Sequence, residues 1–150
     1  MKAEREVLFV CTGNTCRSPM AAALFNLFNP HAGWEAGSAG IAAFAGDLPS
    51  EWAADVMFND YNIDIRQHRS RPADCTMLSR AEWVLTMTPA QRDALRRACP
   101  EFAGRIMTLG EMAGESDAII EDPFGLDRQI YQDAALTLAR LIKKIISRIG

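Results

Sequence analysis

The sequence predicts an α/β fold in which helices cover both faces of an open, mostly parallel sheet. Short apolar segments alternate along the chain with longer segments of helical periodicity, which is the pattern of strands joined by helical crossovers. The first apolar segment contains the uninterrupted run V-L-F-V at residues 7–10, typical of a strand buried on both faces. A chain of 150 residues suits one domain with a substantial core.

The apolar and periodic segments give the expected elements in chain order. Strands are expected at residues 6–10, 34–38, 83–87 and 105–109. Helices are expected from Pro19 to about residue 28, from Pro49 and Ser50, from Pro72, and from residue 88 to about residue 98. The final segment is the clearest helix, with an apolar stripe formed by Ala134, Leu138, Leu141, Ile142, Ile145 and Ile149. Residues 110–125, rich in glycine and acidic residues, are expected to form a long loop.

The composition is that of a globular protein and excludes several classes of function. Hydrophobic residues make up 49% of the chain and charged residues 23%, with a net charge of −3. Binders of nucleic acid or of anionic membranes usually carry an excess of positive charge, so neither partner is expected. The N-terminal residues lack the pattern of a signal peptide, and no apolar run is long enough to cross a bilayer. A cytosolic location is therefore expected.

The cysteines do not form a metal-binding pattern. The chain has four of them and two histidines, with no C-x-x-C pair, so we expect neither a structural zinc site nor any other metal or cofactor. In a reducing compartment the default state of all four is a free thiol. They are Cys11, Cys16, Cys75 and Cys99.

The motif C-T-G-N-T-C-R-S, between the first strand and the first helix, predicts a phosphate-binding loop. Backbone N–H groups of such a loop converge on one point, and the helix dipole favours an anion there. Gly13 permits tight curvature, Asn14 tolerates left-handed dihedrals, and Arg17 can bind two oxygens of a phosphate. The residues expected around the phosphate are Thr12, Gly13, Asn14, Thr15, Cys16, Arg17 and Ser18.

Cys11 is the candidate nucleophile, because donors that hold an oxyanion also favour a thiolate. Ser18 can donate a further hydrogen bond to its sulfur. A thiolate aimed at phosphorus predicts a nucleophilic phosphatase. The alternative is a small buried cysteine with Arg17 as a surface charge. The strand before the motif and the helix after it favour the catalytic interpretation.

Such an enzyme also needs an acid to protonate the leaving group. Asp122, in the sequence I-I-E-D-P-F-G, lies in the expected loop before the last helix. Pro123 would stiffen this loop, and Phe124 could line a pocket. Glu121 is the alternative acid because it is adjacent, and an acid at the start of the last helix is the alternative role for Asp122.

The motif C-T-G-N-T-C-R-S-P-M together with the distant D-P-F-G resembles the low-molecular-weight protein phosphatases. The resemblance extends from residue 7 to the final helix and includes S-A-G at residues 38–40 and H-R-S-R at residues 68–71. It implies a four-stranded parallel sheet and a metal-free, two-step hydrolysis of phosphorylated proteins. In that reaction Cys11 resembles the nucleophile that forms a phosphocysteine intermediate.

The resemblance also implies roles for the residues around the nucleophile. Arg17 resembles the clamp on the phosphate and the transition state, and Ser18 the residue that steadies the thiolate. Asp122 resembles the general acid of the first step and the base for water in the second. Asn14 resembles the residue that fixes the loop, within a supporting polar network that includes Ser38 and His68. For His68 alone, an ordinary surface histidine is the alternative.

Cys16 resembles the partner that closes a reversible disulfide with the nucleophile under oxidation, which a thiol reductant would reopen. A packed small thiol is the alternative. The chain departs from many relatives at Ala22, where they carry glutamate, and in the acid loop, where they carry D-P-Y or two tyrosines and this chain has Phe124 followed by Gly125. The segment I-A-A-F-A-G-D-L-P at residues 41–49 does not align cleanly, so Phe44 is either a rim aromatic or a core residue.

The residue at position 15, Thr15, bears on which phosphorylated side chain the site accepts. Tyrosine phosphatases of this family usually have an aliphatic residue there, which suits a phenol ring, whereas threonine offers a hydroxyl. Thr15 together with D-P-F-G resembles the protein-arginine phosphatases, in which Asp122 would serve as acid and as partner of the guanidinium. We therefore expect a preference for phosphoarginine, with a strict phosphotyrosine enzyme as the alternative. The expected pocket residues are Thr12, Thr15, Phe44 and Phe124.

The first loop also resembles that of the thioredoxin-coupled arsenate reductases. Those enzymes need two further cysteines, one of them close after the third strand. Here that strand ends L-T-M at residues 85–87, and no cysteine follows before Cys99. This disfavours a reductase. The presence of both a nucleophile and an acid disfavours a non-catalytic phosphate-binding module.

Overall fold

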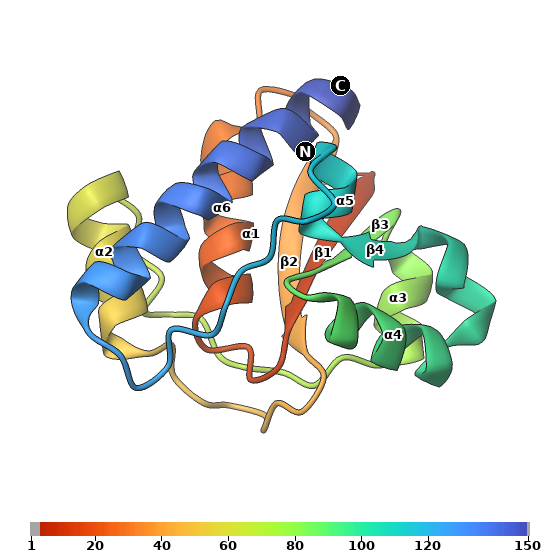
Figure 1. The fold of residues 1–150 in the computed structure, drawn as a ribbon, viewed down its shortest axis with the longest axis horizontal. Coiled ribbons are helices and arrows are strands. Elements are labelled where there is room, and N and C mark those ends of the chain that lie inside the picture. The colour runs from red at the N-terminus through yellow and green to blue at the C-terminus, as the bar shows by residue number, and fades with distance from the viewer. Residues whose placement is uncertain (1–3, 150) are drawn as a thin grey trace.

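The computed structural model describes residues 4–149 and has the expected α/β class. Four parallel strands form one sheet in the order β2-β1-β3-β4 (Figure 1). The strands are β1 (Arg5–Cys11), β2 (Trp34–Gly40), β3 (Trp83–Thr86) and β4 (Ile106–Thr108). Because the chain leaves β1 toward β2 on one side and later forms β3 on the other, the carboxyl end of β1 lies at a topological switch point, where such sheets bind ligands.

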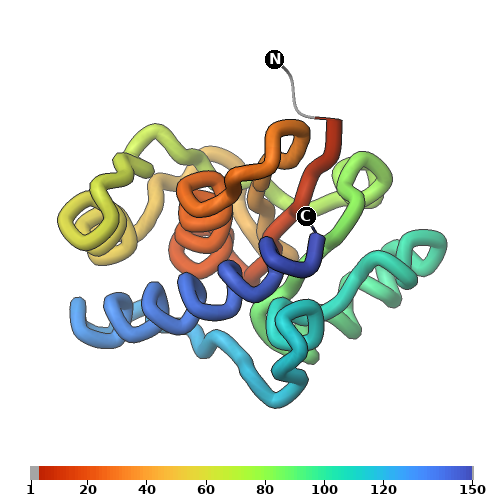
Figure 2. The backbone as a smooth tube through the Cα atoms, turned by 90° about the horizontal axis from the view of Figure 1, so that it is seen from above, coloured from red at the N-terminus to blue at the C-terminus, as the bar shows by residue number. Residues whose placement is uncertain are grey.

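Helices cover both faces of the sheet, as expected. One face carries α1 (Arg17–Phe28), α2 (Glu51–Tyr61), α5 (Leu109–Ala113) and α6 (Arg128–Ile149). The other carries α3 (Cys75–Arg80) and α4 (Pro89–Ala98), followed by the 3-10 helix η1 (Pro100–Arg105). The helices α1 and α6 pack against each other, as Figure 2 shows. No helix within residues 4–149 combines the length and the apolar character that crossing a membrane requires.

The apolar run of β1 forms the centre of two separate cores. Val7, Phe9 and Cys11 pack among the residues of α1 and α6, whereas Leu8 and Val10 face α3 and α4. All five are buried because β1 is an interior strand with helices on both sides. The alternation follows from the two-residue period of a strand, and it leaves Cys11 at the end of the α1 side.

The expectation of one long loop at residues 110–125 is wrong in its first part, because α5 begins at Leu109. The Thr108 hydroxyl accepts the N–H of Glu111 at 2.9 Å, and the Glu111 carboxylate accepts the N–H of Thr108 at 2.8 Å. This capping box starts a helix in spite of Gly110. Gly110 is required there, since a Cβ would meet the carbonyl oxygens of Glu115 and Ala118.

Several boundaries differ from the expected ones for local reasons. The strand β2 continues two residues further, to Gly40, because its pairing with β1 runs to Cys11. The strand β4 is shorter than expected, since residue 105 belongs to η1 and residue 109 to α5. The helix α3 begins at Cys75 rather than at Pro72, because the side chain of Asp74 caps it by accepting the N–H of Met77.

The expectation of four free thiols is also wrong. Cys75, at the start of α3, and Cys99, at the end of α4, form a disulfide with their Cα atoms 5.6 Å apart. The two residues are separated by 24 positions in the sequence, and only the packing of α3 and α4 on the same face brings them together. Cys11 and Cys16 are the free cysteines of the described chain.

Candidate active site

A cavity of about 290 Å³ opens at the carboxyl end of the sheet. Three segments that are distant in the sequence form its walls: the loop between β1 and α1, the segment after β2, and the segment before α6. Figure 1 shows these segments together at the lower end of the sheet. The lining residues are Cys11, Thr12, Gly13, Thr15, Cys16, Arg17, Ala42, Ala43, Phe44, Asp47, Asp122 and Phe124.

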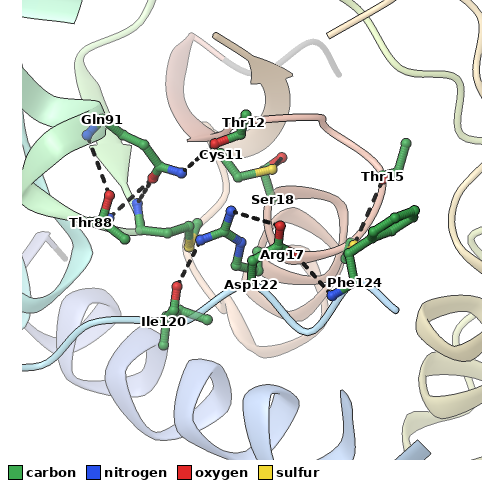
Figure 3. Close-up of polar contacts among 12 residues, drawn as sticks. Cys11, Thr12, Thr15, Arg17, Ser18, Thr88, Gln91, Ile120, Asp122 and Phe124 are labelled. Carbon is green, nitrogen blue, oxygen red and sulfur yellow. Dashed lines mark hydrogen bonds and ion pairs between the residues drawn. The ribbon is translucent and has the colours of Figure 1, made fainter. Parts of the chain in front are cut away.

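Cys11 is buried, and its sulfur has two hydrogen-bonding groups beside it. The Ser18 hydroxyl lies 2.9 Å from Sγ (Figure 3). The backbone N–H of Asn14 donates to Sγ at 3.3 Å. Donors of this kind stabilise negative charge on sulfur. The loop therefore supplies a thiol at a helix N-terminus with the surroundings that a thiolate needs.

Asn14 organises the loop from beneath. It adopts the left-handed conformation expected for it, with φ of 57°, and is fully buried. Its side-chain amide donates to the hydroxyls of Ser18 at 2.8 Å and Ser38 at 3.0 Å, and its side-chain oxygen accepts the N–H of Arg71 at 3.0 Å. His68 donates from Nε2 to the Asn14 carbonyl oxygen at 2.8 Å, since a carbonyl can only accept. The structure thus brings together all four members of the expected supporting network.

Gly40, rather than Gly13, is the glycine on which the loop depends. The backbone φ of Gly13 lies outside the left-handed region, and a Cβ there would meet only the Thr15 hydroxyl, at 3.8 Å. A Cβ on Gly40, by contrast, would lie 2.6 Å from the Thr12 carbonyl oxygen and 3.0 Å from the Asn14 Cβ. The end of β2 therefore supports the loop by close backbone approach.

Replacing Gly40 with alanine should displace the loop, because the Thr12 backbone would have to move. We expect the free energy of unfolding to fall by about 1–3 kcal/mol, the usual cost of overpacking, and the affinity for inorganic phosphate to fall with it. Denaturant unfolding and competitive inhibition by phosphate measure the two effects. The matched control is Gly104→Ala, whose Cβ would meet nothing within 4 Å. Equal effects of the two substitutions would contradict the conclusion that Gly40 supports the loop by close backbone approach.

Arg17 and Asp122 face each other across the cavity. The buried guanidinium of Arg17 donates from Nη1 to the carbonyl oxygen of Ile120 at 2.9 Å, and its Nη2 lies 3.9 Å from an Asp122 carboxylate oxygen. The other Asp122 oxygen accepts the N–H of Phe124 at 3.0 Å. Figure 3 shows both side chains directed toward Cys11. The arginine is held by the same segment that carries the acid.

The structure separates the two candidate acids. Asp122 lines the cavity that contains Cys11, whereas Glu121 lines a different depression together with Asp117 and Arg140. Adjacent residues in an extended segment point to opposite sides, so only one of them can face Cys11. Asp122 is the acid that lines the same cavity as Cys11.

Two aromatic side chains stand at the mouth of the cavity. Phe44 is 78% exposed and Phe124 is 69% exposed, and both line the cavity. The alternative of Phe44 as a core residue is therefore wrong. Thr15 lies half-buried on the wall of the same cavity, with its hydroxyl 3.7 Å from the sulfur of Cys16.

Cys16 lines the cavity and is packed against α6. It is buried, and its sulfur lies 3.9 Å from the hydroxyl of Tyr131 on α6. Burial raises the pKa of the Cys16 thiol above its usual value, against the opposing effect of the hydrogen bond from Thr15. These contacts fit a packed thiol. A disulfide between Cys16 and Cys11 stays a prediction.

Two residues that position the site were not expected from the sequence. Gln91, in the first turn of α4, donates from Nε2 to the Thr12 hydroxyl at 3.1 Å. Its carbonyl oxygen accepts the N–H groups of Met87 and Thr88, so it ties β3 to the phosphate loop. The capping box T-x-x-Q at residues 88–91 was the available signal, but it indicates only a helix start.

Ser70 is the second missed residue, and it fixes the cavity wall that carries Phe44 and Asp47. Its buried hydroxyl donates to the Phe44 carbonyl oxygen and accepts the N–H of Asp47 at 2.8 Å. Its backbone N–H donates to the Asp47 carbonyl oxygen at 2.9 Å, and its own carbonyl accepts the N–H of Gly46 at 2.8 Å. The segment 68–71 therefore supports both the floor of the cavity and one wall.

Comparison with known proteins agrees with this geometry. A protein-arginine-phosphatase from Geobacillus stearothermophilus is 38% identical over 144 residues, which cover 95% of each chain. A probable low molecular weight protein-tyrosine-phosphatase, EpsP, from Ralstonia solanacearum is 33% identical over 145 residues, which cover 97% of this chain and 96% of that protein. The crystal structure of a low molecular weight protein tyrosine phosphatase from T. tengcongensis superposes with a TM-score of 0.92 at 40% identity, covering 96% of this chain and 99% of that one.

The family comparison covers almost the whole sequence. The family described as low molecular weight phosphotyrosine protein phosphatase matches residues 6–150, which include every residue that lines the cavity. The chain therefore belongs to the low molecular weight phosphotyrosine protein phosphatase family.

Proposed function

We propose that this cysteine-dependent phosphatase hydrolyses phosphoarginine, and to a lesser extent phosphotyrosine, in protein substrates. One observation carries the proposal: a single cavity joins the Cys11 thiol, the Arg17 guanidinium and the Asp122 carboxyl group, with Thr15 on its wall. A nucleophile, an anion clamp and a proton donor are the three groups that phosphoryl transfer through a covalent intermediate needs.

In the first step the Cys11 thiolate attacks phosphorus, and the bond from phosphorus to the leaving nitrogen or oxygen breaks. The leaving atom takes the bond's electron pair and a proton from the Asp122 carboxyl group. Arg17 and the N–H groups of the loop hold the three remaining phosphoryl oxygens, where charge is concentrated in the transition state. The product is a phosphocysteine and a free arginine or tyrosine side chain.

In the second step a water molecule attacks the phosphocysteine, and the Asp122 carboxylate accepts its proton. The phosphorus–sulfur bond breaks, which releases inorganic phosphate and restores the thiolate. Ser18 and the Asn14 N–H, both beside the sulfur, stabilise the departing thiolate. The carboxyl group of Asp122 regains in this step the proton that it gave in the first.

The preference for phosphoarginine rests on Thr15 and Asp122. The guanidinium of phosphoarginine is planar, cationic and rich in N–H donors, so it needs acceptors rather than an apolar wall. The Thr15 hydroxyl and the carbonyl oxygen of the half-exposed Asp122 carboxyl group are acceptors on the cavity wall. The similarity to a relative named as a protein-arginine-phosphatase supports the same choice.

A strict phosphotyrosine enzyme is the second candidate, and the two aromatic residues favour it. The rings of Phe44 and Phe124 line the mouth of the cavity, where they could stack on a phenol ring. Kinetics on phosphoarginine and phosphotyrosine in the same peptide sequence separate the two candidates. We expect a higher kcat/KM on phosphoarginine, and a large excess on phosphotyrosine would overturn the preference.

Replacing Thr15 with isoleucine should shift this ratio toward phosphotyrosine. The change removes a hydroxyl acceptor and adds apolar surface on the cavity wall, so we expect the phosphoarginine to phosphotyrosine ratio of kcat/KM to fall about tenfold or more. Thr15→Val, which replaces the hydroxyl by a methyl group at nearly constant volume, tests the hydroxyl alone. An unchanged ratio in both variants would remove Thr15 as the selector.

No observation favours an arsenate reductase. The first turn of α4 contacts Thr12 through Gln91, and Cys99 lies at the other end of that helix, about 15 Å away for ten residues. Cys75 and Cys99 therefore lie away from Cys11. The proposal keeps the expected cytosolic location, with a thiol reductant as the partner that would reopen a disulfide between Cys11 and Cys16.

A further inference from the structure

A second carboxylate, Asp47, lines the cavity together with Cys11, Arg17 and Asp122. It comes from the segment after β2, and its side chain is exposed to solvent. Within residues 4–149 its carboxylate oxygens have neither a hydrogen-bond donor nor a cation in contact. Among the described residues that line the cavity, Arg17 is the one cation, and its Nη1 donates to the Ile120 carbonyl oxygen while its Nη2 lies beside Asp122.

The backbone of Asp47 is held in place. Its N–H and its carbonyl oxygen both bond to Ser70, at 2.8 and 2.9 Å, and the preceding N–H of Gly46 bonds to the Ser70 carbonyl oxygen at 2.8 Å. Ser70 is buried, and the adjacent Arg71 is tied to Asn14 beneath the phosphate loop. The carboxylate of Asp47 is therefore carried by a segment anchored to the floor of the site rather than by a free loop.

A carboxylate in this position has an electrostatic consequence. A bound phosphoryl group is an anion, and a second anion on the wall of the same cavity repels it. Asp122 does not repel the phosphoryl group in the first step, because it is protonated when it acts as the acid. Asp47 donates no proton in the reaction, so its negative charge is not removed in this way. The repulsion is offset when the substrate itself brings a positive charge into the cavity beside the phosphorus.

We propose that Asp47 is a specificity-determining residue that binds the guanidinium group of phosphoarginine. This inference rests on the proposed function of the site and adds one more residue that selects phosphoarginine over phosphotyrosine. Phosphoarginine places a cation one bond from phosphorus, and the outer nitrogens of its guanidinium carry N–H groups that a carboxylate accepts well. Phosphotyrosine offers no positive charge and no N–H group, so Asp47 only repels it.

The test is Asp47→Asn, assayed on two blocked peptides of identical sequence. One carries phosphoarginine as its only cationic group, and the other carries phosphotyrosine in its place. We expect kcat/KM on phosphoarginine to fall about five- to tenfold, the range for a partly exposed, charged hydrogen bond. On phosphotyrosine we expect a rise of about twofold, since a like charge near the phosphate is removed. Higher salt should shrink both effects.

Glu51→Gln is the matched control for a general change of charge. Glu51, in the first turn of α2, lines a neighbouring depression and not the phosphate cavity. The same loss of one negative charge there should change both substrates equally and little. An effect of Asp47→Asn equal to that of Glu51→Gln would overturn the inference.

The outcome also separates this inference from the proposed function. If the wild-type protein prefers phosphoarginine but Asp47→Asn lowers both activities by the same factor, the inference fails and the proposed function stands. If the wild-type protein prefers phosphotyrosine and Asp47→Asn still lowers only the phosphoarginine activity, the proposed preference fails and the role of Asp47 stands. Thermal unfolding of the variant shows whether the Ser70 contacts have been kept.

Discussion

Replacing Cys11 with serine is expected to reduce kcat by about 10⁴-fold or more, the largest effect of any single change in this chain. A serine hydroxyl is a far weaker acid than a thiol, whereas the Cys11 sulfur can hold a negative charge beside the Ser18 hydroxyl and the Asn14 N–H. Serine is also nearly the same shape, so the loop should keep its fold. Steady-state hydrolysis of either phosphopeptide measures the loss.

Binding by the same variant distinguishes loss of chemistry from loss of structure. Because Arg17 and the loop N–H groups are unchanged in Cys11→Ser, the variant should still bind inorganic phosphate, as calorimetry can measure. Cys75→Ser serves as a control for the loss of a sulfur outside the cavity and should keep turnover at 25 °C. If Cys11→Ser retained near wild-type kcat, the nucleophile would be another residue.

Replacing Asp122 with asparagine is expected to give the second largest effect, a loss of about 10²- to 10³-fold in kcat, within the usual range for a general acid. The loss should depend on the leaving group. Phosphoarginine and phosphotyrosine release basic atoms that need a proton, whereas p-nitrophenyl phosphate releases a stable anion that does not. We therefore expect phosphoenzyme formation, measured in single-turnover experiments, to slow far more with the peptides than with p-nitrophenyl phosphate.

Glu121→Gln is the matched control for Asp122→Asn. The two acids are adjacent, but Glu121 lines a different depression, so its amide should leave the dependence on the leaving group as in the wild-type protein. If Glu121→Gln produced the leaving-group effect instead, the acid would be misassigned. If neither variant did, protonation would come from solvent or from another group.

Features that lie within one short stretch of sequence were predictable. The phosphate loop is formed by residues 11–18, and its chemistry follows from a strand, a curved backbone and a helix N-terminus in direct succession. Asn14 takes the expected left-handed dihedral because the reason for it is local. The apolar stripe of α6 and the buried run of β1 likewise predicted their elements, since periodicity is a local property.

Features that depend on contacts between segments distant in the sequence were harder to predict from it. Periodicity did not indicate α5, because its signal is one capping box in a glycine-rich stretch. The disulfide between Cys75 and Cys99 joins two helices that only the layer arrangement brings together. The support of Thr12 by Gln91 depends on the neighbouring positions of β1 and β3 in the sheet. None of these contacts has a repeating pattern in the sequence.

The sequence by itself determined the α/β class and the strand–loop–helix unit that carries Cys11 and Arg17, because contiguous residues build that unit whatever surrounds it. Only the tertiary structure decided which of two adjacent acids faces the sulfur. The segment before α6 is held by Ile120, whose N–H donates to the Met87 carbonyl oxygen and whose own carbonyl accepts from Arg17, and that anchoring turns Asp122 inward. The place of Asp47 on the cavity wall was also decided by the tertiary structure alone. Its backbone is fixed by Ser70, which lies 23 positions away in the sequence, and no local pattern connects the two residues.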